Sequence, residues 1–259
     1  MEILIGFVIA VAIAMTGVGA GTVTAPTLIL FLGMPLPMAV GTALIFGAVV
    51  KSIAAPVYWI RKQVHWRTLW YLLAGGLPGV IVSSLVLSRF GIGNSQGFLL
   101  TLLGLTIIVT AGRTFFSKAI REGIPPKDRT GWLPLIAAPI GAEVGFSSAG
   151  AGALGTSALM LMTPLTVTEV VGTDLFFGLA LSLVGGGAHL AMGDFSSSVV
   201  WKLIAGGIAV AIVGATLATR VPGRIFRYAL SLWLVYLGFE LCHKGWHSIA
   251  VQYASFFRF

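Results

Sequence analysis

The stretch GVGAGTVTAP at residues 17–26 decides the fold, because it breaks a long apolar run with closely spaced glycines. A second broken stretch, SSAGAGALGTS, lies at residues 147–157. With a shift of 131 residues and no gaps, the sequence aligns with itself at Gly19-Ala20-Gly21 on Gly150-Ala151-Gly152 and at Val40-Gly41-Thr42 on Val171-Gly172-Thr173. Agreement at one fixed offset predicts that the chain is an internal duplication.

The composition is that of a membrane protein. Of the 259 residues, 57% are hydrophobic and 9% are charged, and the mean hydropathy is +0.99. A helix needs roughly 20 apolar residues to cross a bilayer, so the chain has room for about six to eight crossings and for no soluble catalytic domain. The single cysteine, Cys242, excludes an intrachain disulfide and a cysteine-based metal or redox site, so we expect no cofactor.

Each half of the chain shows the same order of apolar segments. A glycine-broken opening stretch is followed by three long apolar segments that have the length of transmembrane helices. The opening stretches are 1–33 and 132–164, and the long segments are 38–60, 68–87, 95–112, 168–190, 199–218 and 226–243. We therefore predict an all-α polytopic membrane protein with repeats at 1–112 and 132–259, joined by a basic linker at 113–131.

The charges of the loops indicate how the two repeats are oriented. The loop at 61–67 carries three basic residues, whereas the equivalent loop at 192–198 carries only Asp194, and the bias reverses in the next pair of loops. Basic loops stay in the cytoplasm, so equivalent loops lie on opposite sides of the inner membrane and the linker 113–131 is cytoplasmic. The net charge of +8 thus reports orientation and not a nucleic-acid partner.

Inverted repeats require an odd number of crossings in each half, so each opening stretch must be a re-entrant helical hairpin. The alternative is one kinked spanning helix in each half, which gives parallel repeats. Irregular backbone inside a membrane must be buried in protein, so we expect the two hairpin tips to lie against each other.

A helix that restarts after a glycine break presents free N–H groups and a positive dipole end, which favours an anion site. The alternative for the glycines is close helix packing. The candidate substrate-binding residues at the breaks are Gly19, Gly21, Thr22, Thr24, Ser147, Ser148, Gly150, Gly152 and Thr156. Thr42 and Thr173 join this set if they face the tips, and are structural if they bond back to their own helices.

Three ionisable residues interrupt apolar segments. Lys51 lies about ten residues, or roughly 15 Å, before the basic loop, so it is either a counter-charge for an anionic substrate or half of an ion pair with Glu143 or Asp174. Glu143 and Asp174 are candidates for carrying a coupling ion, H+ or Na+. His189, near the end of its segment, is interpreted as a capping or interfacial residue, and the alternative is a proton relay.

With the two glycine-rich breaks, the elements Ala39 to Thr42 and Val170 to Thr173 resemble the TauE/SafE sulfite exporter family over nearly the whole chain. The resemblance implies a secondary carrier, and not an enzyme, for small sulfur-containing or organic anions such as sulfite or a sulfonate. Alanine at Ala20 and Ala151 and serine at Ser148 depart from the usual triple-glycine pattern, which leaves the substrate open.

The predicted partners are a small anion, a coupling ion and the lipid bilayer, and a homodimer is compatible with the sequence. No nucleotide-binding motif is present, so a gradient must drive alternating access. The rival functions are an anion channel and an intramembrane enzyme. The chain contains neither His-Glu-x-x-His nor Gly-x-Ser-x-Gly, which argues against the enzyme.

Overall fold

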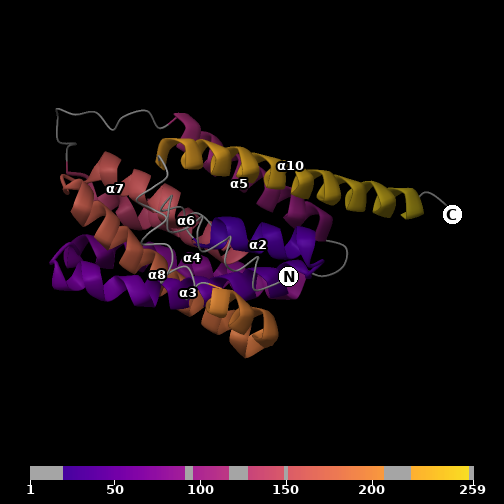
Figure 1. The fold of residues 1–259 in the computed structure, drawn as a ribbon, viewed down its shortest axis with the longest axis horizontal. Coiled ribbons are helices and arrows are strands. Elements are labelled where there is room, and N and C mark those ends of the chain that lie inside the picture. The colour runs from indigo at the N-terminus through magenta and orange to yellow at the C-terminus, as the bar shows by residue number, and fades with distance from the viewer. Residues whose placement is uncertain (1–19, 91–95, 117–127, 149–150, 207–222, 257–259) are drawn as a thin grey trace.

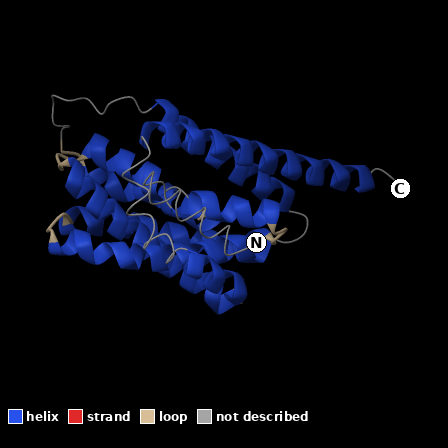
Figure 2. Cartoon of the chain, in the orientation of Figure 1, coloured by secondary structure: helices blue, strands red, loops and turns tan. Residues whose placement is uncertain are grey.

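The computed structural model describes residues 20–90, 96–116, 128–148, 151–206 and 223–256. Gly19, Gly150 and most of the linker 113–131 lie outside these ranges. The described residues form helices joined by short turns, as predicted, and contain no strand (Figure 2).

The described helical segments have the following bounds. In chain order they are α2 (Ala20–Phe31), α3 (Leu36–Ile60), α4 (Trp66–Phe90), α5 (Gln96–Phe116), the 3-10 turn η1 (Thr130–Trp132), α6 (Leu133–Ser147), the π-helical η2 (Ala151–Gly155), α7 (Thr156–Met162), α8 (Val167–Met192), a helical segment at 197–206, and α10 (Gly223–Phe256). Where the structure describes the predicted long apolar segments they are helices, and residues 207–218 of the segment 199–218 lie outside the described residues. α10 continues well beyond residue 243, where the prediction ended.

Among the described helices, α3, α4 and α8 are long and apolar enough to cross a membrane. Their 25 or 26 residues correspond to about 38 Å, which exceeds the hydrocarbon thickness of roughly 30 Å. Local sequence fixes where α8 starts: Thr166 and Glu169 form a reciprocal capping box. The start of α3 follows Pro35, and a proline in its first turn costs no hydrogen bond.

The helices pack in pairs. α3 packs on α8, and α4 packs on both α6 and α8, so α8 is covered from two sides. α5 and α10 run side by side along one edge of the molecule, and α2 lies between α10 and α3 (Figure 1).

Local geometry recurs at the same offset of 131 residues as the sequence. At the end of α3, the N–H of Lys62 donates to the carbonyl of Trp59 at 2.9 Å; at the end of α8, the N–H of Gly193 donates to the carbonyl of Leu190 at 3.2 Å. Lys62 and Gly193 also share a left-handed backbone, with φ of 54° and 78°. Equivalent sequences thus end equivalent helices in the same way.

α3 and α8 run in opposite directions along their contact. Gly41, near the start of α3, lies against the carbonyl oxygen of Asp194, which follows the end of α8. Gly172, near the start of α8, lies against the carbonyl oxygen of Gln63, which follows the end of α3. In both places an added Cβ would overlap the carbonyl oxygen, so glycine is required for this approach.

Candidate functional site

The two glycine-broken stretches meet at Gly21 and Ser148. Ser148 follows α6 in a left-handed conformation, with φ of 57°, and its hydroxyl donates to the carbonyl of Gly21 at 3.1 Å. A Cβ on Gly21 would overlap the carbonyl oxygen of Ser148, so the backbones are in direct contact. We call this pair the tip contact.

Gly21 and Gly152 lie inside helical segments, because α2 begins at Ala20 and η2 at Ala151. The prediction that each helix restarts after its glycines was therefore wrong for these two residues. Thr22 and Thr24, in the first turns of α2, are almost fully buried. Ser147 is also buried and donates its hydroxyl to the carbonyl of Glu143 within α6.

The second broken stretch leaves and returns at the same end of the molecule. The N–H of Arg129, before α6, donates to the carbonyl of Met162, the last residue of α7, at 2.8 Å. α6 has 15 residues and α7 has seven, so both are shorter than a spanning helix. The described residues from Arg129 to Met162 therefore run out along α6 to Ser148 and return along η2 and α7, which both contact α6; we call this segment the second hairpin.

Lys51 lies in the interface between α3 and α8. Its ammonium donates to the carbonyl of Gly178 at 3.0 Å and to the hydroxyl of Ser182 at 2.8 Å. Both partners are uncharged, and within the described part of the chain Lys51 forms no ion pair with a carboxylate. The ion pair with Glu143 or Asp174 that the sequence left open is therefore not formed.

Asp174 lies on the same face of α8 as the two partners of Lys51, because Asp174, Gly178 and Ser182 are spaced by four residues. Thr156 donates its hydroxyl to Asp174 Oδ2 at 2.7 Å. Asp174 Oδ1 is buried and has no hydrogen-bond partner among the described residues. We call Asp174, Gly178 and Ser182, together with the Lys51 ammonium that reaches them from α3, the α8 polar row.

The polar row and the tip contact are joined by η2. This segment begins three residues after Ser148, and its last residue, Gly155, lies so close to Asp174 Oδ1 that a Cβ would overlap it. The second hairpin thus makes two contacts: Ser148 contacts Gly21, and Gly155, at the end of η2, contacts Asp174.

Among the described residues, the hydroxyls of Thr42 and Thr173 bond to loops outside their own helices. The N–H of Ser196 donates to Thr42 Oγ1 at 3.0 Å, and the N–H of His65 donates to Thr173 Oγ1 at 2.9 Å. The two donors are themselves 131 residues apart. Each threonine is fully buried and anchors the loop after the opposite long helix, so the Val-Gly-Thr elements act as two reciprocal clasps between the halves.

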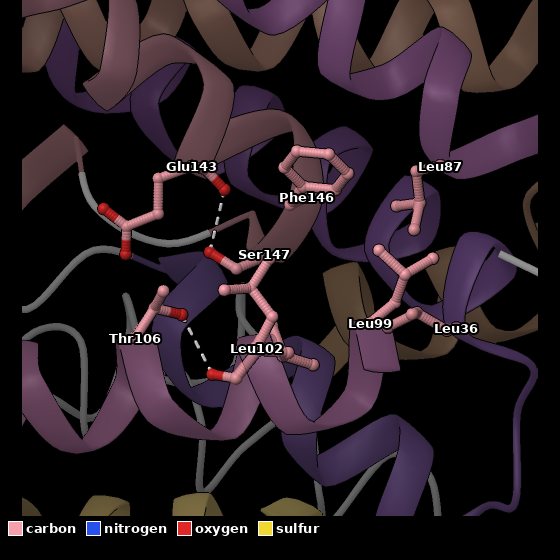
Figure 3. Close-up of a pocket in the computed structure, with 9 residues that line it drawn as sticks. Leu36, Leu87, Leu99, Leu102, Thr106, Glu143, Phe146 and Ser147 are labelled. Atoms are coloured by element: carbon pink, nitrogen blue, oxygen red, sulfur yellow. Dashed lines mark hydrogen bonds between the residues drawn. The ribbon is translucent and has the colours of Figure 1, made fainter. Parts of the chain in front are cut away.

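Glu143 lies apart from the polar row. It lines a cavity of about 120 Å³ together with leucines from α3, α4 and α5, Thr106, Phe146 and Ser147 (Figure 3). Its Oε1 is buried and makes no hydrogen bond in the described structure. The structure therefore does not bring the two candidate coupling carboxylates into one cluster.

The interpretation of His189 as a capping or interfacial residue was wrong. Its side chain is fully buried, because Gly41 allows α3 to pack directly on it. Its Nδ1 lies 3.9 Å from Asp194 Oδ2, which also accepts a hydrogen bond from Ser88. Sequence reasoning also missed Ser182, although its position 131 residues after Lys51 was a usable signal.

Basic residues gather at the end of the molecule where the second hairpin begins and ends. Hydrogen bonds from the side chain and the N–H of Thr130 hold the pKa of the exposed Asp128 below its ordinary value, and the charges of Arg67 and His65 act in the same direction. The basic loop at 61–67 therefore lies near Asp128, in the part of the linker 113–131 that the structure describes.

Spanning apolar helices and charged groups set between them define an integral membrane protein. The family model described as "Sulfite exporter TauE/SafE" matches residues 2–241, and the chain belongs to this family of membrane transporters. It is 25% identical over 217 residues to the "Probable membrane transporter protein YjnA" of Bacillus subtilis (strain 168), an alignment that covers 79% of this chain and 84% of the relative. No solved structure matches the chain.

Proposed function

We propose that the protein is a secondary transporter that carries a small sulfur-containing or organic anion, such as sulfite or a sulfonate, across the cytoplasmic membrane without chemical change. The observation that carries the proposal is the position of Lys51. The residue lies about 5 Å along the helix axis from the middle of α3, and its ammonium is held by two neutral oxygens.

A cation at this depth is costly unless a negative charge compensates it, because the surrounding hydrocarbon does not solvate it. No carboxylate among the described residues comes within ion-pair distance of Lys51. An anion that enters the α3–α8 interface supplies a negative charge in direct contact with the ammonium, which gives the site its preference for anions.

The tip contact provides the second part of the anion path. There the Ser148 hydroxyl donates to the carbonyl of Gly21 in the first turn of α2, and the hydroxyl-bearing residues Thr22 and Thr24 of the same helix are buried. We assign substrate contacts along the path to Gly21, Thr22, Thr24, Ser147, Ser148, Gly152 and Thr156, with Gly19 and Gly150 beyond the described residues. Thr42 and Thr173 act instead as clasps.

The transport cycle is alternating access of two inverted repeats, at 1–112 and 132–259. The antiparallel contact of the equivalent helices α3 and α8 supports inversion, and so do the reciprocal clasps. The bond between Arg129 and Met162 supports a re-entrant second hairpin. The basic end that includes Arg67 and Arg129 faces the cytoplasm, in agreement with the positive-inside rule.

Uptake into liposomes that contain the purified protein tests the proposal. The substrates are sulfite, thiosulfate, methanesulfonate and acetate, and the variants are Lys51→Ala and, as a control, Lys244→Ala on the exposed surface of α10. We expect saturable uptake of at least one sulfur oxyanion, reduced roughly tenfold or more in Lys51→Ala because a hydrogen-bonded charge contributes about 1.5–3 kcal/mol. Lys244→Ala should match the wild type.

Two results would contradict the proposal. Non-saturating conductance in planar bilayers would favour an anion channel over a carrier. Absence of flux for all four anions, in folded protein, would remove sulfur and carboxylate anions as the substrate class.

A further inference from the structure

We infer that Asp174 is the binding site of a coupling proton, and that its carboxylate is protonated when an anion binds at Lys51, so that each anion crosses the membrane together with one proton. The inference rests on the proposed anion transport and identifies its coupling ion.

The geometry makes Asp174 the resting counter-charge of Lys51. The Lys51 ammonium contacts the face of α8 that carries Asp174. Its partners on that face, Gly178 and Ser182, follow Asp174 by about one and two helical turns. The two charges interact, but they do not form a direct ion pair. Lys51 therefore keeps donor capacity for a second anion while Asp174 balances its charge from a distance.

An incoming anion and the Asp174 carboxylate would then compete for one cation. Two negative charges beside a single ammonium in a site of low dielectric constant repel each other strongly. A proton on Asp174 removes this repulsion and leaves the site with one cation and one anion. Asp174 Oδ1, buried and without a hydrogen-bond partner in the described structure, is the atom available for that proton.

Among the described residues, the other helices packed on α8 bring no second charge to Asp174. Their ionisable side chains are Lys51 and Tyr58 on α3, Arg67, Tyr71 and Arg89 on α4, and Glu143 on α6, whereas η2 and α7 have none. Of these, Lys51 interacts electrostatically with Asp174, and Thr156 supplies its hydrogen bond. The nearby loop residue His65 contacts Thr173 through its backbone N–H.

The surroundings favour a proton over a metal cation. Hard cations require a shell of several oxygen ligands, and the oxygen bonded to Asp174 within the described structure is the Thr156 hydroxyl. No cluster of three or more acidic, histidine or cysteine side chains occurs among the described residues. The ammonium of Lys51 would also repel a bound cation.

The charge balance of the cycle follows directly. The Asp174 carboxylate takes up one proton as the anion binds, and it releases the proton when the anion leaves on the other side, while Lys51 remains an ammonium. A monovalent anion is then carried without net charge, and a divalent anion moves one negative charge per cycle.

The experiment measures anion exchange and proton movement in the same liposomes, with the full-length protein. The probes are methanesulfonate and thiosulfate, which stay ionised near neutral pH and therefore carry no proton through the lipid themselves. Asp174→Asn mimics the protonated carboxylate, and Asp194→Asn, at the far end of α8, is the matched control.

In the wild type we expect anion exchange that rises as pH falls, with proton uptake coupled to anion entry. Asp174→Asn should exchange anions at a rate that does not vary with pH and should move no protons, whereas Asp194→Asn keeps both the pH dependence and the proton movement. Proton-coupled entry in folded Asp174→Asn would overturn the inference, and so would loss of its exchange.

Thr156→Val provides a second test if Asp174→Asn does not fold. Removal of the hydroxyl destabilises the ionised carboxylate, so exchange should reach half its maximum at a higher pH. An unchanged pH profile would count against a proton on Asp174. Absence of exchange in the wild type would instead contradict the proposed transport function, so the two failures are distinguishable.

Discussion

Lys51 and Ser182 occupy equivalent positions in the two halves of the chain, 131 residues apart, and their side chains are hydrogen-bonded at 2.8 Å. In an arrangement with two-fold symmetry, a residue that contacts its own equivalent lies at the symmetry axis. Carriers with inverted repeats bind substrates where the repeats meet, near the bilayer midplane. In the proposed inverted-repeat carrier, the pairing would place Lys51 where both sides of the membrane reach it in turn.

Ser182→Ala should weaken anion binding less than Lys51→Ala does. The ammonium keeps its bond to the Gly178 carbonyl, but it loses the oxygen that fixes its direction. We expect the KM for the transported anion to rise several-fold and kcat to change little, because the loss of one such bond costs about 1 kcal/mol or more. Ser182→Thr, which keeps the hydroxyl, is the control; identical KM values for the wild type and Ser182→Ala would contradict the assigned role.

Gly41→Ala should destabilise the folded protein. Its Cβ would overlap the Asp194 carbonyl and come within 2.7 Å of His189 Cβ, and backbone atoms cannot move aside cheaply. The expected loss is about 1–3 kcal/mol, read as a lower melting temperature in detergent. Gly187→Ala is the matched control on α8, because nothing lies within 4 Å of the added Cβ, and it should melt at or above the wild-type temperature.

The two clasps should contribute independently to stability. Thr42→Val and Thr173→Val each leave a partly buried backbone N–H without its acceptor, at Ser196 and His65, and each should cost about 1 kcal/mol. The sites lie at opposite ends of the antiparallel helices, so the losses in a double variant should add. Serine at either position keeps the acceptor and should melt close to the wild type, whereas a valine variant as stable as its serine counterpart would argue against a clasp.

Helix positions were largely predictable from the sequence, because length and hydropathy are local properties. The predicted segment 168–190 is α8 at Val167–Met192, and 38–60 is α3 at Leu36–Ile60. The end of α10 was not predictable in this way, because its last part is polar and continues as helix beyond the apolar stretch.

The contacts of the site were less predictable, because they depend on which helices pack together. Lys51 was identified by its depth in an apolar segment, but its partners lie on α8, more than 120 residues away. The burial of His189 was not predicted, because its position near a helix end does not reveal that Gly41 of α3 packs on its side chain. The Val-Gly-Thr elements were recognised as a motif, but only the folded chain shows what their hydroxyls bind.

Arg67 and Ser198 provide a direct test of inversion, because they are equivalent positions, 131 residues apart, and both are exposed near the start of a helix. In a Cys242→Ala background, which removes the single native thiol, Arg67→Cys and Ser198→Cys can each be labelled with a membrane-impermeant thiol reagent. Inverted repeats place the two cysteines on opposite faces of the membrane. We expect Ser198→Cys to react in intact cells, and Arg67→Cys to react only after the cytoplasmic side is opened. Labelling of both from the same side would show that the repeats are parallel, and the hairpin interpretation of the opening stretches would then fail with them.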